Sequence, residues 1–185
     1  MIEVNAIEIK RVQMRLGKYQ KKAPLVISRT LNRVAANVKT NIGRKTRELY
    51  IVKAKDISNT MTIKKATQSI MNAFVKSKGQ KVPLDKFKVS PSTPRPANPP
   101  SSLKVAVKKD GTKDLLHAFV ANINGNKVFQ REGKSRLPIK RLFGPAIPQM
   151  VGNQEVRQYV EKEAAAMYQK RLAHEIKRVI EGGSR

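Results

Sequence analysis

The sequence predicts an α+β fold, in which N-terminal helices precede a central antiparallel β-sheet and a long C-terminal α-helix closes the chain. Three observations lead to this prediction. Apolar residues recur at helical spacing over residues 1–50, alternate with polar residues in short runs over 60–150, and return to helical spacing over 153–182. Helices and strands that are segregated along the chain in this way are typical of α+β proteins.

The N-terminal part of the chain predicts two helices. An apolar stripe marks the first helix and breaks over residues 17–22. Pro24 suits the first turn of a second helix, which we expect to run to Leu49. The first stripe consists of Ile9, Val12, Leu16 and Tyr19. The second stripe consists of Ile27, Leu31, Val34, Ala35, Val38 and Ile42.

The face of the second helix opposite its apolar stripe is basic. It carries Arg29, Arg33 and Lys39. Because clustered cations attract polyanions, we expect these three side chains to face DNA or another polyanion.

Residues 60–150 predict a β-rich region, which follows a short helix over Lys55–Thr60. Apolar and polar residues alternate there in short runs, as they do in half-buried strands. The runs cover residues 62–66, 69–77, 87–89, 103–109, 117–123 and 127–131. Asn124-Gly125-Asn126 separates the last two runs and is a hairpin turn signal. We expect these runs to form one antiparallel sheet.

A proline-rich segment interrupts the β-rich region at residues 90–102. Its sequence, SPSTPRPANPPSS, excludes a helix and a central strand, because proline fixes its own φ and lacks the backbone N–H donor. Two interpretations remain open: a surface loop, or an extended arm that reaches a neighbouring subunit. A polyproline conformation would suit an arm, since it is stiff and loses little entropy on docking.

The last predicted element is a helix over residues 153–182. Asn153 can cap it, Glu155 lies in its first turn, and Gly182-Gly183 ends it. Its apolar stripe consists of Val156, Val160, Ala164, Met167, Leu172, Ile176, Val179 and Ile180. For a chain of 185 residues we expect a single domain over residues 1–185.

Charge is the strongest feature of the composition. The chain has 39 Lys and Arg against 13 Asp and Glu, a formal charge of +26. Such a field attracts nucleic acid, an acidic protein surface or a membrane surface. We expect no membrane partner, because no apolar run reaches the ~18 residues that span a bilayer and the N-terminus has no apolar signal core. Aromatic residues make up only 5%, so stacking platforms for single-stranded nucleic acid are scarce.

The sequence offers no catalytic or cofactor site. Cysteine is absent, which excludes disulfides and thiolate metal sites. His174-Glu175 lacks the second histidine of a metalloprotease motif, so we expect His174 on a solvated helix face and His117 in a structural role. Gly133-Lys134-Ser135 lacks the upstream glycine of a phosphate-binding loop. We therefore expect no enzyme, no metal and no cofactor.

Residues 128–150, VFQREGKSRLPIKRLFGPAIPQM, combine basic, apolar and proline residues. The prolines fix the backbone, and Gly144 permits a turn. We expect a rigid, irregular ribbon that docks on a partner and keeps its basic side chains exposed. The residues expected to dock are Phe129, Arg131, Arg136, Pro138, Lys140, Arg141, Phe143, Gly144, Pro145 and Pro148. A stiff connection between the sheet and the last helix, with no partner, is the alternative.

This stretch resembles the signature of the minor tail protein Z family of tailed bacteriophages and prophages. The matching residues are Phe119-Val120, Gly125, Phe129-Gln130-Arg131, Leu137-Pro138-Ile139-Lys140 and Gly144-Pro145-Ala146-Ile147-Pro148-Gln149. Upstream, residues 31–35 resemble the Asn-Arg step of the family's N-terminal helix, and residues 82–91 resemble its Pro-Leu…Phe strand. Residues 171–180 are similar to its closing helix. The proline-rich segment at 90–102 departs from the family pattern.

The resemblance implies a structural virion protein that completes the tail at its head-proximal end and takes part in head–tail joining. It implies a homo-oligomeric ring, a hexamer by analogy with related neck proteins. The implied partners are the tail tube, tail terminator and head–tail connector proteins, with DNA in the tail lumen as a further contact. The implied location is the virion neck, and the host cytoplasm during assembly. From composition alone, the alternative is a nucleic-acid-binding structural protein of ribosomal type.

Overall fold

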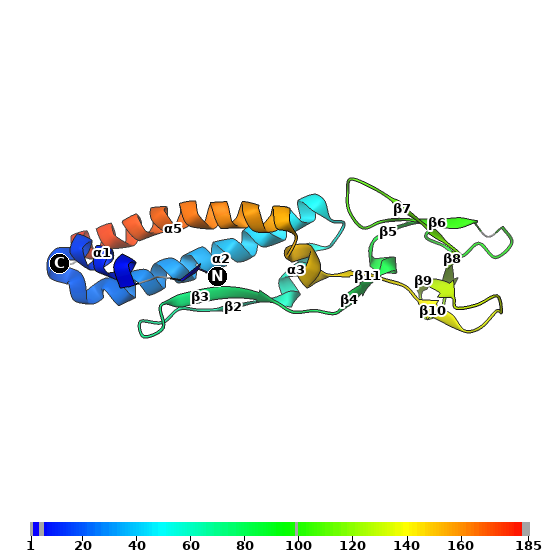
Figure 1. Cartoon of the computed structure of the whole chain (residues 1–185), viewed down its shortest axis with the longest axis horizontal. Coiled ribbons are helices and arrows are strands. Elements are labelled where there is room, and N and C mark those ends of the chain that lie inside the picture. The colour runs from blue at the N-terminus through cyan, green and yellow to red at the C-terminus, as the bar shows by residue number, and fades with distance from the viewer. Residues whose placement is uncertain (1, 4–5, 99, 183–185) are drawn as a thin grey trace. The chain divides into compact units, whose positions relative to one another are not determined.

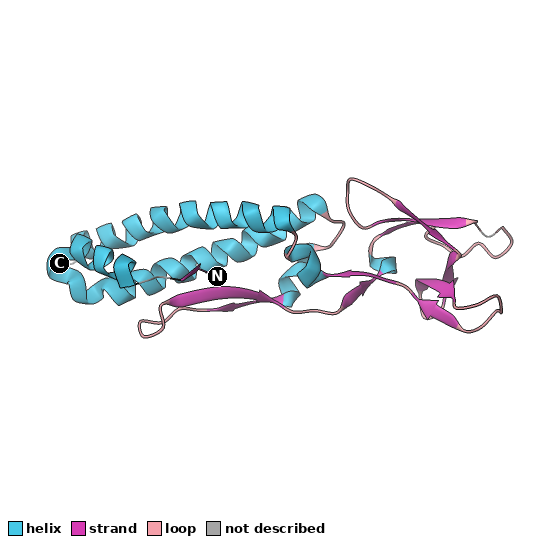
Figure 2. Cartoon of the chain, in the orientation of Figure 1, coloured by secondary structure: helices cyan, strands magenta, loops and turns pink. Residues whose placement is uncertain are grey.

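After the two-residue strand β1 (Ile2–Glu3), helices come first along the chain, strands follow, and a long helix closes it (Figure 1), which agrees with the predicted order. The computed structural model describes residues 2–3, 6–98 and 100–182. Figure 2 distinguishes the helices from the antiparallel strands between them. The predicted α+β fold class is confirmed.

The chain folds as two compact units. The helical unit comprises Met1–Gly43, Met61–Ser77 and Asn153–Arg185. The sheet unit comprises Arg44–Thr60 and Lys78–Gly152. The single domain that the chain length suggests stays a prediction.

The long helices of the helical unit begin and end close to the predicted positions. They are α1 (Ala6–Leu16), the 3-10 helix η1 (Gly17–Lys22), α2 (Ala23–Leu49), which belongs to this unit as far as Gly43, and α5 (Gln154–Gly182). The α1 helix ends where Gly17 adopts a φ of +53°, a left-handed conformation that is open to glycine because it has no Cβ. The α5 helix follows Asn153, whose Oδ1 accepts a hydrogen bond from the Glu155 amide at 3.0 Å.

The apolar stripes of these helices share one core. Within the helical unit, α2 and α5 run in opposite directions (Figure 1). The buried core residues of the helices are Val12, Leu16, Ala23, Val26, Ile27, Leu31, Val34, Ala35, Ala164, Tyr168, Leu172, Ile176 and Val179. The predicted stripes are confirmed with one change on α5, where Tyr168 is buried and Ile180 is 43% exposed.

A small antiparallel sheet completes the helical unit. Its strands are β1 (Ile2–Glu3), β3 (Asn72–Ser77) and β2 (Met61–Lys64), in that order across the sheet. Ala66 and Ala73 are buried in the same core as the helices. The strands predicted at 62–66 and 69–77 are shorter in the structure, because residues 65–71 form the turn between them. Thr67 stabilises this turn by accepting a hydrogen bond from the Ile70 amide at 3.0 Å.

The sheet unit contains short elements around a second core. They are α3 (Ala54–Thr60), β4 (Lys81–Pro83), the 3-10 helix η2 (Leu84–Lys86), β5 (Lys88–Ser90), β6 (Ser102–Ala106), β7 (Lys113–Leu116), β8 (Ala118–Asn122), β9 (Asn126–Arg131), β10 (Ile139–Arg141), β11 (Phe143–Ala146) and α4 (Ile147–Val151). The strands pair in the orders β5-β6-β7, β10-β9-β8 and β11-β4. The buried core consists of Tyr50, Leu84, Phe87, Leu103, Val105, Ala118, Val128 and Met150.

The strands of the described residues are antiparallel, as predicted, but they form four small sheets rather than one. One cause lies at His117, which we expect to begin a strand. The residue instead separates β7 from β8 with a φ of +59°. An extended strand cannot continue through this conformation, so β7 and β8 belong to different sheets.

The turn and loop predictions are largely reproduced. Asn124 and Gly125 both adopt positive φ in the β8–β9 hairpin, as the turn signal predicts. The proline-rich segment connects the paired strands β5 and β6, and most of its described residues are exposed, as in a surface loop. An arm contact with a neighbouring subunit stays a prediction. Across the described residues, no helix combines the length and apolar character needed to cross a membrane.

Candidate docking segment and basic groove

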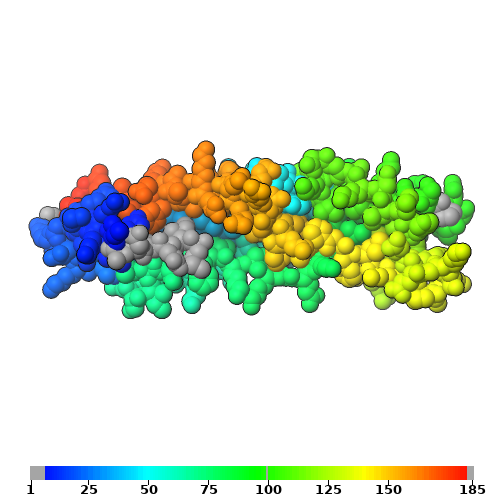
Figure 3. Space-filling view, in the orientation of Figure 1, coloured from blue at the N-terminus to red at the C-terminus, as the bar shows by residue number. Residues whose placement is uncertain are grey.

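Residues 128–150, hereafter the docking segment, contain more regular structure than the ribbon that the sequence predicts. Strand β10 pairs with β9, with Ile139 opposite Arg131, and β11 pairs with β4. The Leu142 amide donates to the Val128 carbonyl oxygen at 2.9 Å, which ties the end of β10 back to β9. The space-filling view shows the segment, in yellow, at the surface of the sheet unit (Figure 3). The segment therefore comprises the end of β9, the strands β10 and β11, and most of the short helix α4.

Arg131 and Phe129 make contacts that stabilise the conformation of the segment. Arg131 Nη1 donates to the Arg136 carbonyl oxygen at 2.6 Å, which closes the loop between β9 and β10. The Arg131 guanidinium also lies 5.3 Å from the ring centre of Phe119. The Phe119 ring contacts the ring of Phe129, which is only 8% exposed. Both expected docking residues thus have an internal structural role.

The expectation that Arg141 stays exposed is wrong. Its Nη2 donates to both carboxylate oxygens of Asp85, at 2.9 and 3.2 Å. The Arg141 side chain is 32% exposed and that of Asp85 only 16%. The Arg141 guanidinium also lies 5.7 Å from the ring centre of Phe143. This partly buried ion pair links β10 to η2, so Arg141 holds the fold of the sheet unit.

Gly144 has a different role from the predicted turn. Its φ lies outside the left-handed region, but a Cβ at this position would lie 2.7 Å from Phe87 Cε2 and 3.3 Å from Leu84 Cδ2. Both neighbours are buried core residues. Glycine is needed here because the strand backbone approaches the core closely, not because the chain turns.

The prolines near the end of the segment lie around the start of α4. Pro145 in β11 and Pro148 in the first turn of α4 are half-buried. The Gln149 side chain turns back and accepts a hydrogen bond from the Ala146 amide at 2.9 Å. This satisfies one backbone donor at the helix start.

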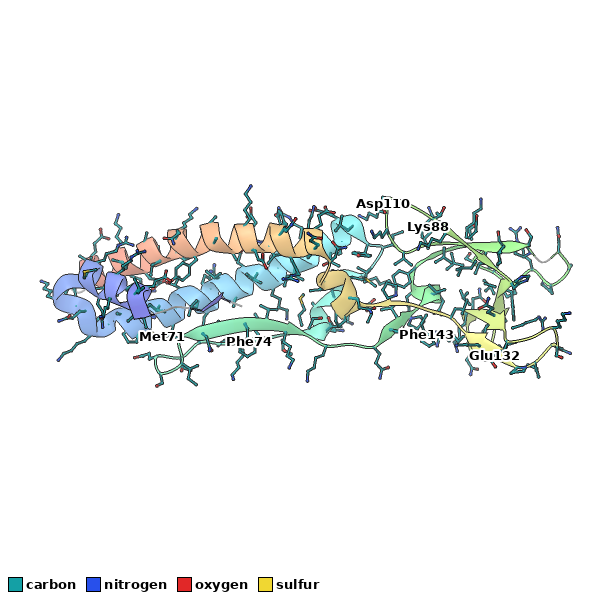
Figure 4. All side chains as sticks on the ribbon, viewed as in Figure 1. Met71, Phe74, Lys88, Asp110, Glu132 and Phe143 are labelled. Carbon is teal, nitrogen blue, oxygen red and sulfur yellow. The ribbon has the colours of Figure 1, made fainter. Side chains whose placement is uncertain are left out.

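The outward side of the segment is apolar and basic. Leu137 is 67% exposed and Phe143 is 48% exposed; Figure 4 labels Phe143. Arg136, Pro138 and Lys140 are also exposed. Within the described residues, neither Arg136 nor Lys140 makes an ion pair. Phe143 lines a cavity of about 430 Å³ whose other lining residues are Leu84, Asp114, Leu115, Leu116, Gln130 and Leu142.

A second feature, the basic groove, lies in the helical unit and has a volume of about 620 Å³. Its lining residues are Arg29, Asn32, Arg33 and Ala36 of α2, Lys65 after β2, and Arg171, His174, Glu175 and Arg178 of α5. The groove brings the predicted Arg29 and Arg33 together with three cations that sequence reasoning misses. The seven-residue spacing of Arg171 and Arg178 places them on one helix face and could have indicated both. Lys65 carries no such signal.

Lys39 is not part of this groove. Its Nζ donates to the Met61 carbonyl oxygen at 3.0 Å, and the side chain is half-buried. The ammonium links α2 to the start of β2. That Lys39 also faces a polyanion stays a prediction.

Comparison with known families decides the identity of the chain. The model of the prophage minor tail protein Z (GPZ) family matches residues 9–181. The chain belongs to the minor tail protein Z family. No curated protein and no solved structure matches it. As a minor tail protein Z, the chain is a structural protein of the phage tail and is associated with the virion.

The structure explains the Asn-Arg step of this minor tail protein Z. Asn32 Nδ2 donates to the Ala66 carbonyl oxygen at 2.9 Å, and its Oδ1 accepts from the Ala66 amide at 2.7 Å. Asn32 thereby fixes the backbone next to Lys65, while Arg33 lines the basic groove beside it. The Asn-Arg step thus positions two cations of the groove: Arg33 on α2, and Lys65 after β2 through the hydrogen bonds of Asn32.

Membership in a structural tail family agrees with a non-enzymatic chain. His174 is exposed on α5, as the sequence predicts, and lines the basic groove. Within residues 2–3, 6–98 and 100–182, no three His, Asp or Glu side chains gather as a metal site would require.

Proposed function

We propose that this minor tail protein Z completes the tail at its head-proximal end and takes part in head–tail joining. The observation that supports this role best is the docking segment. Its internal contacts hold the backbone in place, and it leaves Leu137, Phe143, Arg136 and Lys140 exposed. A preorganised surface with exposed apolar anchors and basic neighbours suits binding to a protein partner, because little ordering entropy is lost on docking.

The proposed assembly is a homo-oligomeric ring, a hexamer by analogy with neck proteins. Its proposed partners are the tail tube, the tail terminator and the head–tail connector, and its place is the virion neck after assembly in the host cytoplasm. A ring forms when two different surfaces of neighbouring copies make contacts that close on themselves. The ribosomal-type alternative gains no support from a family match that spans residues 9–181.

The first prediction tests the docking segment. The double variant Leu137→Ser/Phe143→Ser should leave the melting temperature nearly unchanged, because both side chains are largely exposed. Joined particles in lysates, counted by electron microscopy, should fall at least about tenfold, since each loss repeats in every subunit of an assembly. Filled heads and separate tails should accumulate instead. Arg136→Ser/Lys140→Ser should act in the same direction.

Two controls separate docking from folding. Ile70→Ser changes an apolar residue that is 53% exposed in the helical unit and should leave joining unaffected. Arg141→Ser should lower the melting temperature, because it leaves the Asp85 carboxylate without its partner. Normal joining by a stably folded Leu137→Ser/Phe143→Ser variant would overturn the docking role.

A further inference from the structure

The basic groove is unusual because the chain itself leaves most of its cations without a counter-charge. Glu175 is the one carboxylate that lines it, and its Oε2 lies 3.8 Å from Arg178 Nη1. Within the described residues, Arg29, Arg33, Lys65 and Arg171 make no ion pair. Cations held together without counter-charges repel one another, so an anionic ligand in the groove would relieve this repulsion.

The groove residues occupy fixed elements. Arg29 and Arg33 are four residues apart on one face of α2, and Arg171 and Arg178 are seven apart on one face of α5. The apolar sides of both helices are buried in the core of the helical unit. The backbone next to Lys65 is held by the paired hydrogen bonds between Asn32 and Ala66. The backbone positions that carry the cations are therefore preorganised, which lowers the entropy cost of binding.

The length of the groove matches a nucleic-acid backbone. The lining residues span positions 29–36 on α2 and 171–178 on α5. At about 1.5 Å per residue, each row is about 10 Å long. Successive phosphates of one DNA strand rise by about 3.4 Å along the helix axis and lie further apart along the strand itself, so the groove can contact two successive phosphates.

The chemistry of the lining favours phosphate over an acidic protein. Most of its cations are arginines, whose planar guanidinium groups bind phosphate oxygens with paired hydrogen bonds. An acidic protein partner would need apolar anchors for stable docking, and Ala36 is the one apolar residue in the lining. Among the described residues, the lining has no Phe, Tyr or Trp on which bases could stack.

We infer that the basic groove between α2 and α5 binds the phosphate backbone of duplex DNA without reading its sequence. The inference rests on the proposed function and deepens it, because it names the DNA in the tail as the ligand of the groove. It assigns Arg29, Arg33, Lys65, Arg171 and Arg178 as the phosphate ligands, with Asn32 as a positioning residue.

The test measures binding of the full-length chain to a short mixed-sequence DNA duplex over a series of salt concentrations. The variant Arg29→Gln/Arg33→Gln should bind about tenfold or more weakly and should lower the slope of log K against log salt by about two. The matched control is Arg11→Gln/Arg15→Gln. It removes two exposed arginines at the same spacing from α1 of the same unit, outside the groove.

A variant with the opposite effect guards against misfolding as the explanation. Glu175→Gln removes the negative charge from the groove and should strengthen duplex binding several-fold. Destabilisation would not produce a gain in affinity. Circular dichroism melting of all variants checks that they fold.

Three results would overturn the inference. The groove variant could lose no more affinity than the control, Glu175→Gln could leave duplex binding unchanged, or the chain could bind polyglutamate and not the duplex. Failure of the docking variants to affect head–tail joining would remove the proposed function but leave duplex binding intact. Likewise, a groove variant that binds the duplex as well as the control does would leave the result for head–tail joining unaffected.

Discussion

Basic residues that look alike in the sequence divide into two groups in the structure. The side chains of Arg131 and Arg141 make hydrogen bonds to other parts of the chain, whereas those of Arg136 and Lys140 make no ion pair within the described residues. The difference depends on residues far away in the chain: the partner of Arg141 is Asp85, 56 positions earlier. Local sequence pattern contains no information about such a partner. For this reason the sequence can predict a basic docking segment but not which of its cations remain available.

Tyr168 is a residue that affects stability through its protonation. It is buried at the centre of the α5 stripe with 6% exposure. Burial raises the pKa of its hydroxyl, and the negative charge of Glu8 raises it further. The folded state therefore holds the proton more tightly than the unfolded chain does. The stability that this contributes is fully present below the ordinary tyrosine pKa of about 10 and is lost as pH rises above it.

Thermal melting of the wild type and of Tyr168→Phe tests this effect. Between about pH 8 and about pH 11 the melting temperature of the wild type should fall more than that of Tyr168→Phe, which has no proton to lose. Lysine deprotonation in the same range affects both proteins and cancels in the comparison. Equal falls in both proteins would show that Tyr168 ionises as readily in the folded state as in the unfolded chain.

At the scale of elements, helices are predicted more accurately than strands. The amphipathic stripes, the Gly17 break and the Asn153 cap give boundaries close to those of α2 and α5. Apolar alternation does not reveal β4 and β11, which read KVP and FGPA. They pair only with each other, so both are edge strands, where proline costs no ladder hydrogen bond. Very short strands depend on tertiary pairing rather than on a local pattern.

The C-terminal helix provides a prediction at this scale. Leu172→Asp places a charge at a site that is 4% exposed and should destabilise the helical unit by several kcal/mol. Infectious tails should then fail to form at normal yield. Gln169→Asp adds the same charge at an exposed site of the same helix and should have little effect on melting or on yield. Normal yields of infectious tails from Leu172→Asp would show that this stripe is not needed for assembly.

At the scale of the whole molecule, each unit carries its own candidate surface. The helical unit has the basic groove, and the sheet unit has the docking segment. The sequence indicates the docking segment because its residues are consecutive. It indicates only two of the five cations in the groove lining, because Lys65, Arg171 and Arg178 join Arg29 and Arg33 through folding. The net charge of +26 belongs to the chain as a whole and acts on both DNA binding and self-association.

This charge predicts opposite salt dependences for the two kinds of association. Copies that each carry +26 repel one another, so ring formation should be weak at low salt. The screening length falls from about 10 Å at 0.1 M salt to about 3 Å at 1 M, which reduces this repulsion and should favour larger assemblies. DNA binding should weaken over the same range, because released counterions drive it. Sedimentation velocity of the pure chain and duplex binding can be measured across one salt series. Assemblies that dissociate as salt rises would show instead that ion pairs between copies dominate the ring contact and outweigh the repulsion.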